Sequence, residues 1–142
     1  MNVSSIFREK GTDVVTVTPN QSVAEVTRVL AEKRIGAVVV CKGSRVVGVL
    51  SERDIVRGID RLGADVLALA AAEIMSSPVH CCRRDDSIIE VMGTMTERRI
   101  RHVPVVEDGK LLGIISIGDV VKHRILEAER ENDAMRQYIT TA

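Results

Sequence analysis

The sequence predicts an α/β (α+β) fold made of two β-α-β-β-α repeats related by a pseudo-twofold axis, each a small sheet covered by helices. The first observation is internal repetition, because a shift of 65 positions aligns residues 14–60 with residues 79–125 without a gap. The second is a phrase written twice, GVLSERDIV at 48–56 and GIISIGDVV at 113–121. A constant offset over such a length indicates two copies of one supersecondary unit.

Each unit is predicted to begin with a short strand, over residues 14–17 in the first copy and 79–82 in the second. A helix follows in both copies, and Ser22 and Ser87 stand at its start with Glu three residues later, which is the capping-box pattern. Apolar residues at helical spacing behind each serine predict that one face of this helix packs against a core. The two copies therefore share a strand–helix beginning.

Two further strands and a second helix complete each predicted unit. The runs GAVVVC (36–41) and HVPVVE (102–107) are apolar on both faces, which predicts buried strands beneath helices. The turns KGSR (42–45) and EDGK (107–110) then return the chain in a hairpin, and Asp-Gly is a strong signal for such a turn. A Ser-x-x-Asp sequence opens the last helix of each unit.

One unit of about 50 to 60 residues would be marginally stable alone, so the two copies are expected to share a core. The last helix is expected over about residues 117–138, with its charged far end AERENDAMRQY projecting and helping to pair subunits. Its inward residues are predicted to be Val120, Val121, Ile125 and Leu126. The predicted organisation is an N-terminal segment (1–13), a first repeat (14–60), a linker with a short helix (61–74), a second repeat (75–126) and a C-terminal helix extension (127–142).

Composition narrows the class of protein. The 142 residues are 45% hydrophobic and 28% charged with a formal net charge of zero, which is typical of a soluble globular protein. A neutral chain with one Phe, one Tyr and no Trp offers neither the positive charge nor the stacking surfaces of a nucleic-acid binder. Because no apolar stretch is long enough for a signal peptide or a membrane span, we expect a cytoplasmic protein that binds neither nucleic acid nor membrane.

The three cysteines are Cys41, Cys81 and Cys82, an odd number that favours reduced thiols in a cytoplasmic chain. Cys81 and Cys82 are adjacent, so a strand would point them to opposite faces, and His80 precedes them. This spacing fits no common zinc pattern, so no metal site is predicted and the thiols are interpreted as buried in a strand. A redox sensor built on the adjacent pair is an alternative.

The two copies resemble a known family. The runs RIGAVVV (34–40) and RIRHVPVV (99–106), with VVGVLSERDIV (46–56) and LLGIISIGDVV (111–121), are similar to the tandem cystathionine-β-synthase (CBS) domain pair, also called a Bateman module. The lead-in phrases KGTDVVTVTP and MSSPVHCC match as well, so the resemblance covers nearly the whole chain. It implies a stand-alone CBS-domain protein, a disc-like module that is often a dimer of pairs, and two clefts between the repeats that bind adenosine-containing ligands.

Ser51 with Asp54, and Ser116 with Asp119, have two interpretations. In the first, each pair starts a helix, because an N-cap serine accepts a backbone N–H and an early carboxylate complements the helix dipole. In the second, the carboxylate accepts hydrogen bonds from both ribose hydroxyls, and free backbone N–H groups at the helix start bind a phosphate. The residues alone do not choose between these roles, and the family resemblance implies the second in addition to the first.

The resemblance implies one cleft for each of these carboxylates. The main nucleotide-binding cleft, closed by Asp119, is predicted to contain Lys10, Gly11, Thr12, Asp13, Val17, Ile35, Gly36, Ala37, Arg101, His102, Pro104, Ile115, Ser116, Gly118 and Asp119. A second, weaker cleft closed by Asp54 is predicted to contain Val79, His80, Ile100, Leu50, Ser51, Arg53 and Asp54. Within these sets, the aliphatic side chains of Val17, Ile35 and Ile115 are the candidates to hold the adenine, since stacking aromatics are lacking.

The two predicted clefts are not equivalent. In similar modules, residues at positions 36–37 and 101–102 approach the phosphate of the nucleotide bound by the same repeat. The second copy offers Arg101 for the phosphate and His102 as a further donor, and Gly118 permits close approach. The first copy has no cation at 36 or 37. We therefore expect the Asp119 cleft to hold AMP or a related adenylate, and the Asp54 cleft to be weaker, different or empty.

The sequence contains no P-loop, no dinucleotide-binding glycine motif and no nucleophile elbow, so no enzymatic activity is predicted. The predicted function is a regulatory module that requires no cofactor and binds adenine nucleotides, AMP first, with ATP, ADP or NAD(H) as alternatives. It would signal energy or redox status to an unknown protein partner, as a homodimer of CBS pairs. The competing hypotheses are a dimerisation scaffold with vestigial clefts and the thiol-based redox sensor.

Overall fold

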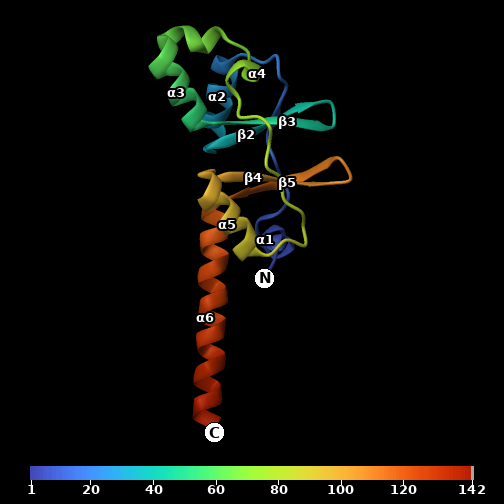
Figure 1. The fold of residues 1–142 in the computed structure, drawn as a ribbon, viewed down its shortest axis with the longest axis vertical. Coiled ribbons are helices and arrows are strands. Elements are labelled where there is room, and N and C mark those ends of the chain that lie inside the picture. The colour runs from blue at the N-terminus through green and yellow to red at the C-terminus, as the bar shows by residue number, and fades with distance from the viewer. Residues whose placement is uncertain (142) are drawn as a thin grey trace.

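The computed structural model describes residues 1–141 and contains two stacked α/β units, from which one long helix projects (Figure 1). The first unit consists of β1 (Thr16–Val17), α2 (Val23–Lys33), β2 (Ala37–Lys42), β3 (Arg45–Ser51) and α3 (Glu52–Leu62). The second consists of α5 (Ile88–Arg98), β4 (His102–Glu107), β5 (Lys110–Ser116) and α6 (Ile117–Thr141). Outside the two units lie α1 (Val3–Lys10), the 3-10 helix η1 (Gly63–Ala68) and α4 (Ala71–Ile74). The predicted fold class, small sheets and helices in two related repeats, is confirmed.

The two hairpins are built on the same register. In the antiparallel pair β2–β3, Ala37 lies opposite Ser51, and in β4–β5, His102 lies opposite Ser116, which is 65 residues further in both strands. Each hairpin also has one register irregularity at the equivalent place. As a result, both hairpins end in a serine that stands immediately before a helix.

The strands that open the two units differ from each other and from the prediction. β1 is two residues long and pairs in parallel with β2, so the predicted strand over 14–17 is shortened. The predicted strand over 79–82 was wrong, because this segment is attached to β4 only through a single parallel bridge from Cys82 to Val105. The Cys82 N–H donates to the Pro104 carbonyl at 2.9 Å, and the Cys82 carbonyl accepts the Val106 N–H at 3.0 Å.

Each unit has a hydrophobic core that is completed by the segment preceding the other unit. α1 contributes Val3, Ile6 and Phe7 to the core of the second unit. η1 and α4 contribute Val66 and Ala71 to the core of the first. α1 was not predicted, although its apolar residues follow the i, i+3, i+4 spacing of an amphipathic helix. Each core therefore depends on residues that precede the other unit in the sequence.

The glycine that opens the repeated phrase has the same steric role in both copies. A Cβ at Gly113 would lie 2.7 Å from Cζ of Phe7, and a Cβ at Gly48 would collide with the side chain of Met75. Because real Cβ atoms do not approach other atoms so closely, glycine is what allows the preceding segments to lie against the hairpins.

The serine caps predicted for α2 and α5 form, but only in part. Ser22 and Ser87 each accept the N–H of the glutamate three residues later, at 3.1 Å in both helices. Among residues 1–141, the return bond from the glutamate that completes a capping box is formed at neither helix. Complete reciprocal boxes are formed instead by Ser51 and Asp54 at the start of α3 and by Ser116 and Asp119 at the start of α6. The reciprocal caps of the two hairpin–helix junctions therefore coincide with the two Ser-x-x-Asp phrases.

α6 leaves the body of the molecule after its first turns. Its buried residues are Val120 and His123, whereas Val121 and Ile125 are 45% and 52% exposed. The prediction that Val121 and Ile125 face inward was wrong, because the buried stripe of α6 follows the neighbouring positions of the helix. From residue 129 to residue 141 every side chain is exposed, and Figure 1 shows this part extending away from both units. Between residues 1 and 141, no helix combines the length and the apolar character that crossing a membrane requires.

Candidate functional site

A cavity of about 340 Å³ lies at the junction of the two units, and both units contribute to its walls. The first unit supplies the end of β3 and the start of α3, including Ser51 and Asp54. The second supplies the segment leading into it, with Ser76 and residues 78–80, and the turn between α5 and β4, residues 99–102. This volume falls within the range of sites that bind small molecules.

Asp54 is buried at the start of α3, beside this cavity. Its Oδ2 accepts the N–H and the hydroxyl of Ser51 at 2.9 and 3.1 Å, and its Oδ1 accepts the hydroxyl of Ser76 at 3.0 Å. Ser51 belongs to the first unit and Ser76 to the segment that leads into the second, so these donors fix the carboxylate at the junction. A carboxylate oxygen can accept two hydrogen bonds, so Oδ1 retains capacity for a hydroxyl of a bound ligand.

Arginine side chains dominate the polar wall of the cavity. They are Arg53, Arg57, Arg99 and Arg101. Two carboxylates, those of Glu52 and Asp54, oppose them, so the wall carries a positive excess. Guanidinium groups stay charged and bind phosphate through paired N–H donors, so this wall suits an anionic ligand.

The turn before β4 has a backbone conformation that few side chains adopt. Arg99 ends α5 with φ 55°, in the left-handed region, and Arg34 ends α2 in the same way with φ 54°. For a residue other than glycine this conformation costs about 1 kcal/mol. In the second unit, the Arg99 carbonyl accepts a hydrogen bond from Nη1 of Arg53 at 3.4 Å, so the start of α3 helps to hold the turn.

Aliphatic side chains cover the remaining wall of the cavity. They are Val49, Pro78, Val79, Ile100 and Ile117. Such a surface can hold the flat ring of a base without aromatic stacking. The residues expected in this role lie elsewhere, because Val17 and Ile115 are buried in separate cores and Ile35 packs against the first core.

Two histidines also line the cavity. Burial lowers the pKa of His102, against the opposing effect of the Glu52 carboxylate. His102 is therefore neutral at pH 7 and can offer one N–H but no positive charge. Nε2 of His80 lies 2.9 Å from Nη1 of Arg98, which places this ring at the edge of the arginine group.

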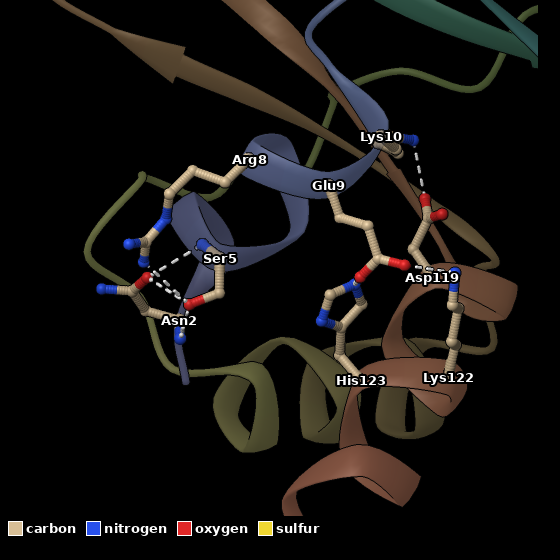
Figure 2. A network of polar contacts seen from close by, with 8 residues as sticks. All are labelled: Asn2, Ser5, Arg8, Glu9, Lys10, Asp119, Lys122 and His123. Carbon is tan, nitrogen blue, oxygen red and sulfur yellow. Dashed lines mark hydrogen bonds and ion pairs between the residues drawn. The ribbon is translucent and has the colours of Figure 1, made fainter.

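Asp119, the equivalent carboxylate of the second unit, has different neighbours (Figure 2). Its Oδ2 accepts the N–H and the hydroxyl of Ser116, both at 2.9 Å, and also the ammonium group of Lys10 at 2.7 Å. Burial by itself would raise the pKa of Asp119, but the hydrogen bonds from Lys10 and Ser116 outweigh it and hold the pKa below its usual value. Asp119 does not line the cavity described above.

α1 is anchored to α6 beside this ion pair. Figure 2 shows Glu9 and Lys10 reaching from α1 toward three side chains of α6. Glu9 forms an ion pair with Lys122, and its Oε2 lies 3.2 Å from Nε2 of His123. The polar groups at the start of α6 are therefore engaged by α1, whereas those at the start of α3 border an open cavity.

The structure gathers most of the predicted second cleft and only part of the predicted main cleft. From the second set, the cavity is lined by Ser51, Arg53, Asp54, Val79, His80 and Ile100, while Leu50 is fully buried. From the main set, it is lined by Gly36, Arg101 and His102. The main-set residues outside this lining are Lys10, Gly11, Thr12, Asp13, Val17, Ile35, Ala37, Pro104, Ile115, Ser116, Gly118 and Asp119.

The placement of Arg101 and His102 differs from the expected grouping, because they share a cavity with Asp54. The two units face each other, so the turn before β4 lies across from the start of α3. The Arg101 carbonyl still accepts the Ile117 N–H at 2.8 Å, so the backbone of this turn contacts its own helix while its side chains line the cavity. The repeat identifies equivalent residues, but it does not reveal which unit they face.

Several lining residues are absent from the predicted second cleft, among them Arg57, Ser76 and Pro78. The sequence does distinguish Ser76 from its equivalent in the first repeat. That equivalent, 65 residues earlier, is Gly11, which has no side chain. The second lead-in segment therefore carries a hydroxyl that the first lacks. Arg57 lies one turn after Arg53 on α3, a spacing that places both side chains on one face of the helix.

The cysteines do not form a reactive pair. Cys82 is buried as predicted, but Cys81 is exposed, so the prediction of two buried strand thiols was wrong for Cys81. Burial raises the pKa of the Cys82 thiol to about 12, with a smaller contribution from the nearby Asp86 carboxylate, and burial also raises the pKa of Cys81. Since the thiolate is the reactive form, these directions disfavour a thiol-based redox sensor.

A duplicated sheet-and-helix unit with a ligand-sized cavity at the junction defines a class of small tandem-repeat α/β modules. The sequence profile of the CBS domain matches residues 3–61 and 71–125, so the chain belongs to the CBS-domain family. A CBS-domain protein from Agrobacterium tumefaciens has a crystal structure that is 42% identical, covers 87% of this chain and 99% of its own, and superimposes with a TM-score of 0.85. A protein with CBS domains from Burkholderia ambifaria is 39% identical over 89% of this chain and 95% of its own, with a TM-score of 0.84.

Curated relatives extend the comparison. The mitochondrial protein CBSX3 of Arabidopsis thaliana is 27% identical over 96% of this chain and 71% of its own length. The chain spans only 57% of an uncharacterized protein from Methanopyrus kandleri, which is 32% identical over 78% of this chain. The CBS domain pair of protein MJ0100, solved in complex with 5′-methylthioadenosine and S-adenosyl-L-methionine, is 22% identical, covers 91% of this chain and 98% of its own, and has a TM-score of 0.77, a likeness of fold.

Proposed function

We propose that this chain is a non-enzymatic regulatory module that binds an adenine nucleotide, AMP first, in the cavity beside Asp54. The observation that carries the proposal is the convergence in one cavity of a fixed carboxylate, an arginine-rich wall and an aliphatic wall. A ribose requires acceptors for its hydroxyls, a phosphate requires cations, and a base requires an apolar slot. The adenosine-containing ligands of the MJ0100 domain pair, a relative in fold, support this ligand class.

Each wall has a proposed role in the complex. Asp54 accepts a ribose hydroxyl through Oδ1, and Val79 and Ile100 flank the base. Arg101 and Arg53 bind the phosphate, and the further arginines could accommodate the longer phosphate chains of ADP, ATP or NAD(H). The Asp119 side, expected from the sequence to be the stronger cleft, is proposed to bind weakly, since Lys10 already occupies its carboxylate at 2.7 Å.

We propose that the bound nucleotide reports energy or redox status to a protein partner. A ligand held by side chains of both units favours one arrangement of the units over another, and it can transmit only that difference. The chain is proposed to act as a pair of copies. Support for pairing comes from the apolar residues left exposed on α3, where Val56, Ile59 and Leu62 are 64%, 48% and 46% exposed.

Calorimetric titration with AMP tests the proposed site through matched variants of the two carboxylates. Asp54→Asn removes the charge beside the cavity and should weaken AMP binding by about tenfold or more, because hydrogen bonds to charged groups contribute about 1.5–3 kcal/mol. Asp119→Asn is the control and should change the affinity less than about threefold.

If Asp119→Asn weakens AMP binding and Asp54→Asn does not, the nucleotide binds on the Asp119 side instead. If neither variant nor the wild-type protein binds AMP, ADP, ATP or NAD(H), the scaffold hypothesis replaces the sensor. Mass spectrometry of small molecules that accompany the purified wild-type protein identifies the natural ligand within the adenine class.

A further inference from the structure

The exposed face of α6 carries a heptad pattern. Starting at Val121, residues spaced alternately by four and three are Val121, Ile125, Ala128, Asn132, Met135 and Ile139. With Ile125, Asn132 and Ile139 at the a positions of the heptad, Val121, Ala128 and Met135 fall at the d positions. Apolar residues at a and d form the seam through which helices supercoil around each other.

Over the residues that the structure describes, five of the six seam residues are exposed, and Ala128 is half-buried. Val121, Ile125, Met135 and Ile139 are 45%, 52%, 61% and 71% exposed. Figure 1 shows α6 extending beyond both units, so its far half contacts neither sheet. An isolated helix of about 12–15 residues is marginal in water, so a partner helix would stabilise this half.

We propose that α6 pairs with α6 of a second copy as a parallel, in-register, two-stranded coiled coil. The inference rests on the pairing part of the proposed function and is independent of nucleotide binding. Asn132 is the central a residue, and a single Asn at an a position specifies a register and a two-stranded state. In a parallel pair the two amides meet across the seam and hydrogen-bond to each other. In an antiparallel pair Asn132 would face an apolar d residue and lose that partner.

Charged residues beside the seam also favour a parallel pair. In parallel coiled coils a g residue faces the e residue that lies five positions further along the other helix. Glu131 at g then faces Arg136 at e of the second copy, and Arg124 at g faces Glu129 at e. Both contacts join opposite charges, and the twofold symmetry of the dimer repeats each of them. Over residues 1–141, neither Glu131 nor Arg136 forms an ion pair within its own chain.

The base of α6 continues the same surface. Ile117, Gly118, Val121, Ile125 and Leu126 line an open groove on this side of the helix. Gly118 has no side chain, so a second helix can approach the backbone closely at that point. The coiled coil would therefore extend from the tip of α6 to the second unit, and it would set the two second units of the dimer side by side.

Disulfide trapping tests the parallel register in the full chain. In a Cys41→Ser/Cys81→Ser background, which leaves only the buried Cys82, Ile139→Cys places a thiol at an a position and Gln137→Cys places one at the outer f position. Across a parallel seam, two a residues lie within disulfide reach. Oxidation should link most Ile139→Cys chains and less than about a tenth of Gln137→Cys chains. Both positions are exposed in the same turn, so neither variant disturbs a core.

Charge exchange provides a second test by sedimentation. Glu131→Lys and Arg136→Glu each place like charges opposite each other, twice per dimer, and each should raise the dissociation constant of the homodimer about tenfold. An equimolar mixture of the two variants should recover the wild-type constant, because every introduced charge then faces an opposite one. A mixture that associates no better than the single variants overturns the parallel register.

The outcomes separate this inference from the proposed function. A wild-type protein that sediments as a monomer at micromolar concentration overturns the coiled coil together with the pairing, and the AMP titration is unaffected. A dimer in which Ile139→Cys does not link overturns the coiled coil alone and leaves the exposed face of α3 as the site of pairing.

Discussion

Asp54 and Asp119 are equivalent residues with different neighbours. Each accepts the N–H and the hydroxyl of the serine three positions earlier. Asp54 then receives the hydroxyl of Ser76 and borders a cavity, whereas Asp119 receives the ammonium group of Lys10. Ser76 and Lys10 come from matching lead-in segments of the two repeats. The lead-in segment, rather than the repeated Ser-x-x-Asp phrase, therefore decides which further group each carboxylate contacts, and the proposed difference in ligand binding follows from that contact.

The largest expected effect is on the affinity for the phosphate group of AMP in the cavity beside Asp54. Arg101→Ala should weaken AMP binding by about 10–100-fold, since it removes charge-assisted hydrogen bonds to the phosphate. Adenosine lacks the phosphate, so its affinity for the same variant should change less than about twofold. Calorimetry with the two ligands separates phosphate binding from any general damage to the cavity. Equal losses for AMP and adenosine would assign Arg101 a structural role.

The two carboxylates should also differ in their contribution to stability. Asp54→Ala removes a buried carboxylate that accepts hydrogen bonds from the half-buried Ser51 and from Ser76, and we expect a loss of about 2 kcal/mol in the free energy of unfolding, since hydrogen bonds to charged groups contribute about 1.5–3 kcal/mol. Asp119→Ala removes a cap at a half-exposed position and should cost about 1 kcal/mol. Urea denaturation of both variants measures the difference. Equal losses would show that the Ser76 contact adds nothing to the cap.

Lowering the pH should decrease the free energy of unfolding, because His102 is neutral in the folded protein. Because burial lowers the pKa of His102 in the folded state, the unfolded chain binds its proton first, near its ordinary pKa of about 6.5. The free energy of unfolding should therefore decrease as the pH falls below about 6.5 and level off below the folded pKa. His102→Gln should flatten this decrease in urea denaturation between about pH 7.5 and pH 5. A wild-type slope that His102→Gln leaves unchanged would assign the pH dependence to other groups.

The smallest expected change in stability follows from removing the ion pair between Lys10 and Asp119. Lys10→Met installs the residue that stands at the equivalent position, Met75, and removes a partly exposed ion pair. Such a pair contributes less than about 1 kcal/mol, so the fold should be nearly as stable. With its carboxylate released, Asp119 should become available, and the AMP stoichiometry should rise from one to two per chain. A stoichiometry that stays at one would show that Lys10 is not what distinguishes the two sides.

Much of the fold could be predicted because its signals are local. The hairpins, the Ser22 and Ser87 caps and the helices that follow the Ser-x-x-Asp phrase depend on neighbouring residues. α1 was missed although Val3, Ile6 and Phe7 have helical spacing, because their core lies in the distant second unit. The segment 79–82 reads as a strand from its composition, but pairing depends on contacts that only Cys82 makes.

The candidate site could be predicted in its residue types but not in its grouping. Asp54, Asp119 and Arg101 were recognised from their chemistry and from the family resemblance. Their arrangement depends on how the two units face each other in space. The alignment of the two repeats in sequence contains no such information. The ion pair between Lys10 and Asp119 joins residues 109 positions apart, so it too follows from the folded arrangement.

The exchange of core segments has a consequence for how this protein is made. α1 is synthesised before the residues that cover Val3, Ile6 and Phe7, which extend from Cys82 to Val120. A growing chain therefore carries an uncovered apolar helix until most of its sequence has been translated, and such surfaces attract chaperones and promote aggregation. Closing that helix against distant strands also adds non-local contacts, which slow folding relative to a chain of self-contained repeats. The core of the second unit can therefore close only late in synthesis, whereas the buried core residues of the first unit end at Ala71.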